Sequence, residues 1–284
     1  MSNMTRNRLL DRAFRLVGLV ATLLGLLLLA LFLLDILRTG LGRLNWQFLS
    51  ALPSRFPARA GIYTALLGTV WIMVLTAFIA VPVGLAAGVY LEEYGRKSRW
   101  SALLEINITN LAGVPSVIYG LLGLHIFVRL LRMGSSVLAA SCTLALLILP
   151  ILIVATREAI RAVPKTLREA SYALGATRWQ TIWYQVLPAS MGGILTGIIL
   201  ALSRAVGETA PLLVLGVLAY VPFAPKSPLD EFSALPVQIF NWISRPQQAF
   251  GLNAAAAIIV LLLITFGLNG LAIFLRNRWR RHLP

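Results

Sequence analysis

Apolar residues recur along the chain in long runs that are separated by short polar segments. A transmembrane helix needs about 20 consecutive, predominantly apolar residues. The runs that meet this requirement cover residues 14–37, 62–90, 110–131, 137–155, 189–218 and 252–275. The pattern therefore predicts an all-α integral membrane protein with six transmembrane helices.

The composition supports a membrane protein. Of the 284 residues, 58% are hydrophobic and 12% are charged, whereas soluble domains are about 25% charged. The net charge of +15 is also compatible with nucleic-acid binding. Here, however, the cations lie at the ends of apolar runs and not on one polar face, which favours a role in membrane topology.

Lys and Arg are unevenly shared between the two sides of the predicted membrane. If the N-terminus is cytoplasmic, 16 of the 25 Lys and Arg residues lie in cytoplasmic segments and eight lie outside, with Arg204 inside a span. Cytoplasmic loops of membrane proteins carry an excess of these residues. The distribution predicts that both termini are cytoplasmic.

Two connections between the spans are long. In the cytoplasmic connection, residues 156–188, an amphipathic helix that includes Leu167 stops near Gly175, and a second short helix runs from Thr177 and ends before Pro188. This helix-turn-helix is suited to docking a partner; a solvated amphipathic loop is the alternative. The outer connection, residues 219–251, is rich in proline and is predicted to be irregular.

The fifth span contains the sharpest chemical signal, the segment from Ser203 to Thr209. Arg204 lies near the middle of this span, where a charged side chain costs about 2.5–3.5 kcal/mol on insertion scales. Glu208 follows one helical turn later and can pair with it. Because a guanidinium offers a planar fork of donors to an oxyanion, we expect Arg204, Glu208, Ser203 and Thr209 to line an anion path. The alternative is a neutralised pair that only fixes helix packing.

The cytoplasmic connection also carries a family resemblance. The sequence Glu169-Ala170-Ser171, with Gly175 four residues later and Leu187-Pro188 beyond it, resembles the EAA loop of ABC-importer permeases, although Ser171 and Gln185 depart from the usual residues. The resemblance implies coupling helices that insert into a cleft of an ATPase subunit. The residues implied in coupling are Glu169, Ala170, Ser171, Gly175, Ala176, Leu187 and Pro188.

A second resemblance narrows the family. Residues 112–121 together with 204–211 resemble the corresponding segments of the phosphate permeases of this class. This implies the type I ABC importer permease fold, with Ser116 and Tyr119 as further residues lining the path. The implied partners are a second homologous permease subunit, two ATPase subunits, an extracytoplasmic phosphate-binding protein, membrane lipid and inorganic phosphate, without nucleic acid. The implied location is the bacterial plasma (inner) membrane.

The resemblance also divides the chain and assigns the chemistry. Residues 1–13 and 279–284 are expected to be cytoplasmic tails, 14–61 the first transmembrane helix with its outer loop, and 62–278 the permease core with the coupling loop 156–188. The chain has no G-x-x-x-x-G-K-[ST] motif, so we expect a permease that is not an enzyme and holds no cofactor or metal, with ATP and Mg bound by the ATPase subunits. Permeation of sulfate, molybdate or tungstate, and an ATP-independent anion channel, are the alternatives.

Overall fold

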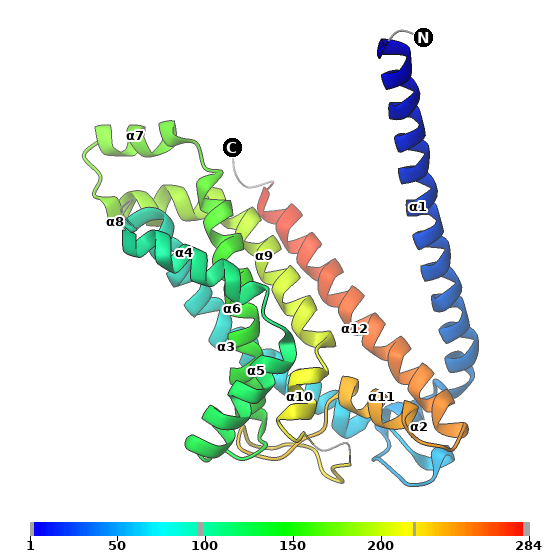
Figure 1. Ribbon diagram of the computed structural model, residues 1–284. Helices are drawn as coiled ribbons and strands as arrows, with labels where there is room; N and C mark the ends of the chain where they lie inside the picture. The colour runs from blue at the N-terminus through cyan, green and yellow to red at the C-terminus, as the bar shows by residue number, and fades with distance from the viewer. Residues whose placement is uncertain (1–2, 96–98, 218–219, 281–284) are drawn as a thin grey trace.

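The computed structural model describes residues 3–95, 99–217 and 220–280, and within them the protein is a bundle of long helices (Figure 1). Five of these helices are long and apolar enough to cross a membrane, and a bent pair of helices makes a sixth candidate span. The described residues contain no strand, only one isolated bridge between Ser136 and Glu231. The predicted all-α membrane architecture is confirmed.

Helix α1 (Asn3–Gly40) contains the first predicted span and stands beside the bundle (Figure 1). None of the apolar window within Leu10–Arg43 is buried in the chain itself. Contact with α12 (Ala249–Arg280) is made near the end of α1, where a Cβ on Gly40 would lie 2.7 Å from the backbone of Ala255. The rest of α1 therefore presents apolar side chains to its surroundings.

Three long helices form the centre of the bundle: α3 (Tyr63–Val89), α6 (Val137–Arg161) and α9 (Leu187–Gly207). Helix α6 packs against both of the others. Two pairs of glycines spaced four residues apart, one on α3 and one on α9, explain this closeness, because each of them faces α6 and lets the backbones approach. A Cβ at these positions would lie 2.4–2.8 Å from an α6 side chain; the positions are Gly84, Gly88, Gly193 and Gly197.

The predicted third span over 110–131 is wrong as a single helix. Helix α4 (Arg99–Ala112) ends before Pro115, and α5 (Ser116–Gly123) begins after it and continues as the π-helical segment η4 (Leu124–Leu130). The two parts are bent by 102°. Proline cannot donate a backbone hydrogen bond, and it disfavours helical geometry in the residue before it, so the chain turns at this point.

The predicted helix ends around the fifth span are also wrong. Helix α8 (Arg178–Thr181) does not stop before Pro188 but continues through the π-helical turn η5 (Ile182–Val186) into α9. Pro188 directly follows this π-helical turn, where the regular i→i−4 hydrogen bonding is already interrupted, so its missing N–H is tolerated. At the other end, α9 stops at Gly207 and α10 (Ala210–Val214) follows. The predicted end of the span at Leu218 lies outside the described residues.

The end of the molecule opposite the chain termini is closed by short helices (Figure 1): η1 (Leu41–Arg43), α2 (Trp46–Ser50), η2 (Pro57–Arg59) and α11 (Leu235–Ile243). The prediction of an irregular connection over 219–251 is therefore wrong at α11. Its proline, Pro236, lies in the first helical turn, where it is compatible with a helix. Buried side chains of α11 then hold the helix in place.

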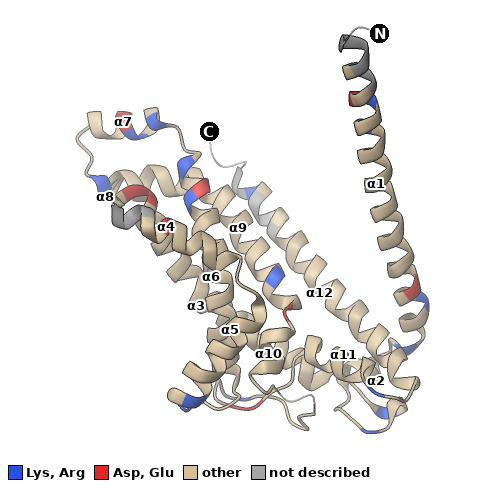
Figure 2. Ribbon diagram, viewed as in Figure 1, with Lys and Arg blue, Asp and Glu red and all other residues tan. Residues whose placement is uncertain are grey.

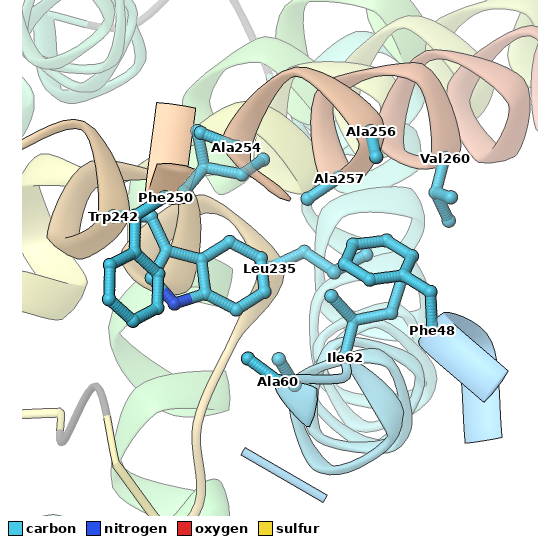
Figure 3. Close-up of a cluster of buried hydrophobic side chains, with 12 residues drawn as sticks. Phe48, Ala60, Ile62, Leu235, Trp242, Phe250, Ala254, Ala256, Ala257 and Val260 are labelled. Carbon is cyan, nitrogen blue, oxygen red and sulfur yellow. The ribbon is translucent and has the colours of Figure 1, made fainter. Parts of the chain in front are cut away.

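An apolar cluster joins these short helices to the bundle (Figure 3). Trp242 is at its centre, with ring centroids 6.0 Å from that of Phe48 and 6.3 Å from that of Phe250. Beside it, Arg43 donates to the carbonyls of Pro57, Ala58 and Ala60 and to Asn253 Oδ1. This end of the molecule is held mainly by close apolar packing.

Candidate functional site

A helical hairpin protrudes at the same end of the molecule as both termini (Figure 1). It consists of α7 (Lys165–Ala173) and α8. Gly175 turns the chain between them with φ +81°, a backbone conformation that glycine adopts without strain. Thr177 then caps α8 in a reciprocal capping box with Gln180. The predicted helix-turn-helix is thus present, with α8 prolonged into α9.

The hairpin encloses an open groove of about 550 Å³. Four of the residues that the family resemblance assigned to coupling line it: Ala170, Ser171, Gly175 and Ala176. The hydroxyls of Ser171 and Thr181 are 2.9 Å apart and join the two arms. Leu174 at the tip is 89% exposed. Tyr184, which also lines the groove, is 68% exposed, so the groove has exposed apolar residues on both of its sides.

The other three residues assigned to coupling lie elsewhere. Glu169 is exposed on α7 and borders a second, charged pocket of about 380 Å³. Leu187 and Pro188 do not line the groove; they form the start of α9. Their position at the joint between η5 and α9 places them in the connection from the hairpin to the membrane helix.

A group of ion pairs connects the hairpin to the bundle. Arg168 on α7 pairs with Glu93 in η3 (Tyr90–Tyr94), the π-helical end of α3, with 2.8 Å between Nη2 and Oε1. Arg178 on α8 donates to the backbone carbonyl of Glu93. Its guanidinium lies over the ring of Tyr94, 5.0 Å from the centroid. Both arms of the hairpin therefore contact the same end of α3.

Further ion pairs join α3, α4 and α6 beneath the hairpin. Glu92 pairs with Arg161 at 3.0 Å and with Arg157 at 3.5 Å. Arg157 also pairs with Glu105 on α4 at 3.1 Å. Charged residues gather at this end of the bundle, as Figure 2 shows, while the bundle between the two ends is almost free of them.

Arg204 and Glu208 form the exception within the bundle. They are paired, with 3.3 Å between Nε and Oε1. Arg204 lies in the last turn of α9, so the prediction that it occupies the middle of a continuous helix is wrong; Glu208 caps that helix from outside. Pro211 lacks the N–H that would bond the carbonyl of Gly207, which explains why α9 ends here and α10 starts anew. A guanidinium in the last turn also interacts favourably with the partial negative charge at the C-terminal end of the helix.

Arg204 keeps most of its hydrogen-bonding capacity. Its side chain is 43% exposed, and its one hydrogen bond to the described residues uses Nε. A guanidinium has five N–H donors. The four donors on the two terminal nitrogens are therefore available to a ligand.

Three of the four other residues predicted to line the path have hydrogen-bond partners of their own. The Ser203 hydroxyl contacts Oδ1 of Asn269 on α12, and the Thr209 hydroxyl lies 3.4 Å from the carbonyl of Gly207. Tyr119 is buried, and its hydroxyl donates to the carbonyl of Leu111 at 2.8 Å across the break between α4 and α5. Ser116 is half-buried at the first position of α5. Whether these four line a path stays a prediction.

Sequence analysis missed Glu93, Arg168 and Asn269. Asn269 was visible as a polar residue within the predicted span 252–275. Glu93 and Arg168 are 75 positions apart, so no local periodicity connects them. Their pairing depends on how α3 and α6 pack.

Comparison with known proteins agrees with this architecture. The sequence profile of the family described as "Binding-protein-dependent transport system inner membrane component" matches residues 80–281. Phosphate transport system permease protein PstA 1 of Mycobacterium tuberculosis (strain ATCC 25618 / H37Rv) is 38% identical over 239 residues, which is 82% of this chain and 75% of that protein. PstA of Xylella fastidiosa (strain Temecula1 / ATCC 700964) is 30% identical over 279 residues, 96% of this chain and 95% of that protein.

Solved structures share the fold. A chain of the MetNI methionine ABC transporter in an inward-facing conformation matches with a TM-score of 0.63 at 18% identity, covering 77% of this chain and 97% of that one. Identity this low supports the fold alone. The matched profile and the sequence relatives show that this chain belongs to the binding-protein-dependent transport system inner membrane components, and the structural match shows that it has the type I ABC importer permease fold.

Proposed function

We propose that this chain is a transmembrane permease subunit of an ATP-driven importer of inorganic phosphate. The observation that carries the proposal is that the Arg204 guanidinium, at the break between α9 and α10, makes one hydrogen bond to the described residues, through Nε. Curated relatives that are 30–38% identical and named as phosphate permeases support the same substrate.

Arg204 would bind the anion through its terminal nitrogens. Phosphate oxygens are strong acceptors, and a guanidinium can donate to two of them in parallel. Glu208, whose side chain is 17% exposed, compensates the arginine charge while no anion is present. When phosphate arrives, it competes with this carboxylate, and release restores the Arg204–Glu208 pair.

Energy would come from a separate subunit. The chain lacks a phosphate-binding loop motif for ATP, and its helical hairpin offers a groove for docking. We propose that two ATPase subunits, which hold ATP and Mg, engage the hairpins of this chain and of a second homologous permease. An extracytoplasmic phosphate-binding protein delivers the anion. The chain lies in a bacterial inner membrane, with both termini and the hairpin on the cytoplasmic side.

The test is uptake by the purified complex in proteoliposomes, with the binding protein supplied on the side opposite the ATPase subunits. We expect uptake of radiolabelled phosphate that requires both ATP and the binding protein and that exceeds uptake of sulfate and molybdate. Preferred uptake of another oxyanion would show that this anion, and not phosphate, is the substrate. Phosphate flux without ATP would indicate an anion channel.

A further inference from the structure

One arginine of the hairpin, Arg168 on α7, contacts both the end of α3 and the end of α6. Nε and Nη2 of Arg168 donate to Oε1 of Glu93 at 3.1 and 2.8 Å, which links α7 to the end of α3. Nη1 donates to the carbonyl of Val163 at 2.7 Å, and Nη2 also donates to the carbonyl of Ile160 at 2.9 Å, near the end of α6. A single guanidinium therefore joins α3, α6 and α7.

This contact is sheltered from solvent. The side chains of Arg168 and Glu93 are 17% and 7% exposed. Ion pairs in such surroundings keep a defined geometry because several hydrogen bonds fix the partners at once. The exposed Arg161–Glu158 pair, at 49% and 61%, connects residues of α6 only. The two pairs differ in that only Arg168–Glu93 crosses from the hairpin to a membrane helix.

The end of α3 is also held by the other arm. The backbone carbonyl of Glu93 accepts a hydrogen bond from Arg178 on α8. Glu92, its neighbour, pairs instead with Arg157 and Arg161 of α6. Among these acidic residues, Glu93 alone is in contact with both α7 and α8 in the described structure.

We propose that Glu93 and Arg168 are a positioning pair that makes the end of α3 move with the hairpin, so that displacement of the hairpin by the ATPase reaches the membrane helices. This inference rests on the proposed function, because it assumes that an ATPase docks on the hairpin. Arg168 keeps α7 attached to α6 through the two carbonyls even when Glu93 is changed. Loss of the Glu93 side chain therefore separates attachment of the hairpin from its link to α3.

The test compares Glu93→Ala with Glu158→Ala in the complete complex in proteoliposomes. Three quantities are measured: retention of the ATPase subunits, stimulation of ATP hydrolysis by the binding protein loaded with inorganic phosphate, and phosphate uptake. We expect Glu93→Ala to retain the ATPase and its basal hydrolysis while stimulation and uptake fall at least tenfold. Glu158→Ala removes a carboxylate from the same surface and is expected to behave like the parental chain.

Parental stimulation and uptake in an assembled Glu93→Ala complex would overturn the positioning role. Equal losses in Glu158→Ala would do the same, since they would indicate a general effect of charge at this surface. If Glu93→Ala does not assemble, Glu93→Gln decides: it keeps an oxygen that can accept from Arg168, and we expect partial stimulation, whereas parental stimulation contradicts the proposal. Failure of the parental complex itself to take up phosphate would instead refute the proposed function.

Discussion

Two arginine–glutamate pairs in this protein differ in how many donors of the guanidinium are hydrogen-bonded within the protein. In the pair at the hairpin, Arg168 uses Nε and both terminal nitrogens, and its carboxylate partner Glu93 is buried. In the pair at the end of α9, Arg204 uses Nε alone and is 43% exposed. The same two residue types thus form a saturated contact in one place and an open one in the other.

The difference indicates two different roles. An arginine that makes four hydrogen bonds within its own protein has little left to offer a ligand, but it can fix the geometry of the elements it joins. Arg204, in contrast, does not join helices through several hydrogen bonds, although it lies within an apolar bundle. Charged residues within membrane spans are functional by default. The contrast supports a joint at Arg168 and a ligand contact at Arg204.

The largest expected effect on stability is at the saturated pair. Removing one partner of a buried ion pair leaves the other charge uncompensated and costs about 3–5 kcal/mol. We expect Glu93→Ala to lower the thermal midpoint of the detergent-purified chain clearly, as followed by tryptophan fluorescence. An unchanged midpoint would mean that Arg168 is adequately solvated without Glu93.

A smaller effect is expected from Gly175→Val at the turn of the hairpin. A Cβ there meets nothing within 4 Å, but φ is +81°, so the cost is backbone strain of about 1–2 kcal/mol. We expect loss of ATPase retention in pull-downs of the complex.

Gly134→Val is the matched control for this prediction. Gly134 also has a positive φ, +64°, and a Cβ added to it would likewise meet no atom within 4 Å. It precedes α6 at the other end of the bundle. We expect comparable destabilisation with normal ATPase retention. If both variants lose the ATPase equally, the loss reflects general destabilisation and the hairpin is not the dock.

The smallest effect on stability is expected at the open pair. Glu208→Gln removes one charge but keeps an oxygen that can accept from Nε of Arg204, whose side chain is 43% exposed, so the expected cost is that of one weakened hydrogen bond, about 1 kcal/mol. The thermal midpoint should therefore change much less than in Glu93→Ala. A comparable decrease would show that Arg204–Glu208 is a structural pair and would remove the contrast between the two sites.

Topology can be examined by cysteine labelling, in which neither member of the two pairs is replaced. Cysteine replacing Arg178 or Ser227 in a Cys142→Ala background is probed with an impermeant thiol reagent on intact cells. Ser227 lies in the connection before α11, opposite the hairpin, and is expected to be labelled while position 178 is protected. The reverse pattern would invert the proposed orientation.

Hydropathy was sufficient to predict most of the fold, because a bilayer requires long apolar helices whatever their order. It failed where the backbone departs from a straight helix. The bend near Pro115 and the stop at Gly207 are local effects of proline within otherwise apolar sequence, and a window of average hydrophobicity does not register them. The continuation through Pro188 depends on the π-helical turn before it.

The candidate site was predicted in part for the same reason. Arg204 and Glu208 are four residues apart, and a short-range rule connects them. Arg168 lies on α7 and Glu93 in η3, and their contact depends on how these elements, 75 positions apart in the sequence, are brought together in the fold. Tertiary contacts of this kind carry no periodic signal in one sequence.

The role proposed for Arg204 is that its terminal nitrogens contact the translocating anion. The measurement that tests it is binding-protein-dependent phosphate uptake by Arg204→Gln and Arg204→Lys complexes, with subunit assembly determined on the same membranes. We expect both to assemble, Arg204→Gln to lose uptake at least a hundredfold, and Arg204→Lys to retain reduced uptake because a point charge remains without the planar fork. Uptake at the parental rate by an assembled Arg204→Gln complex would contradict the claim and place the anion path elsewhere.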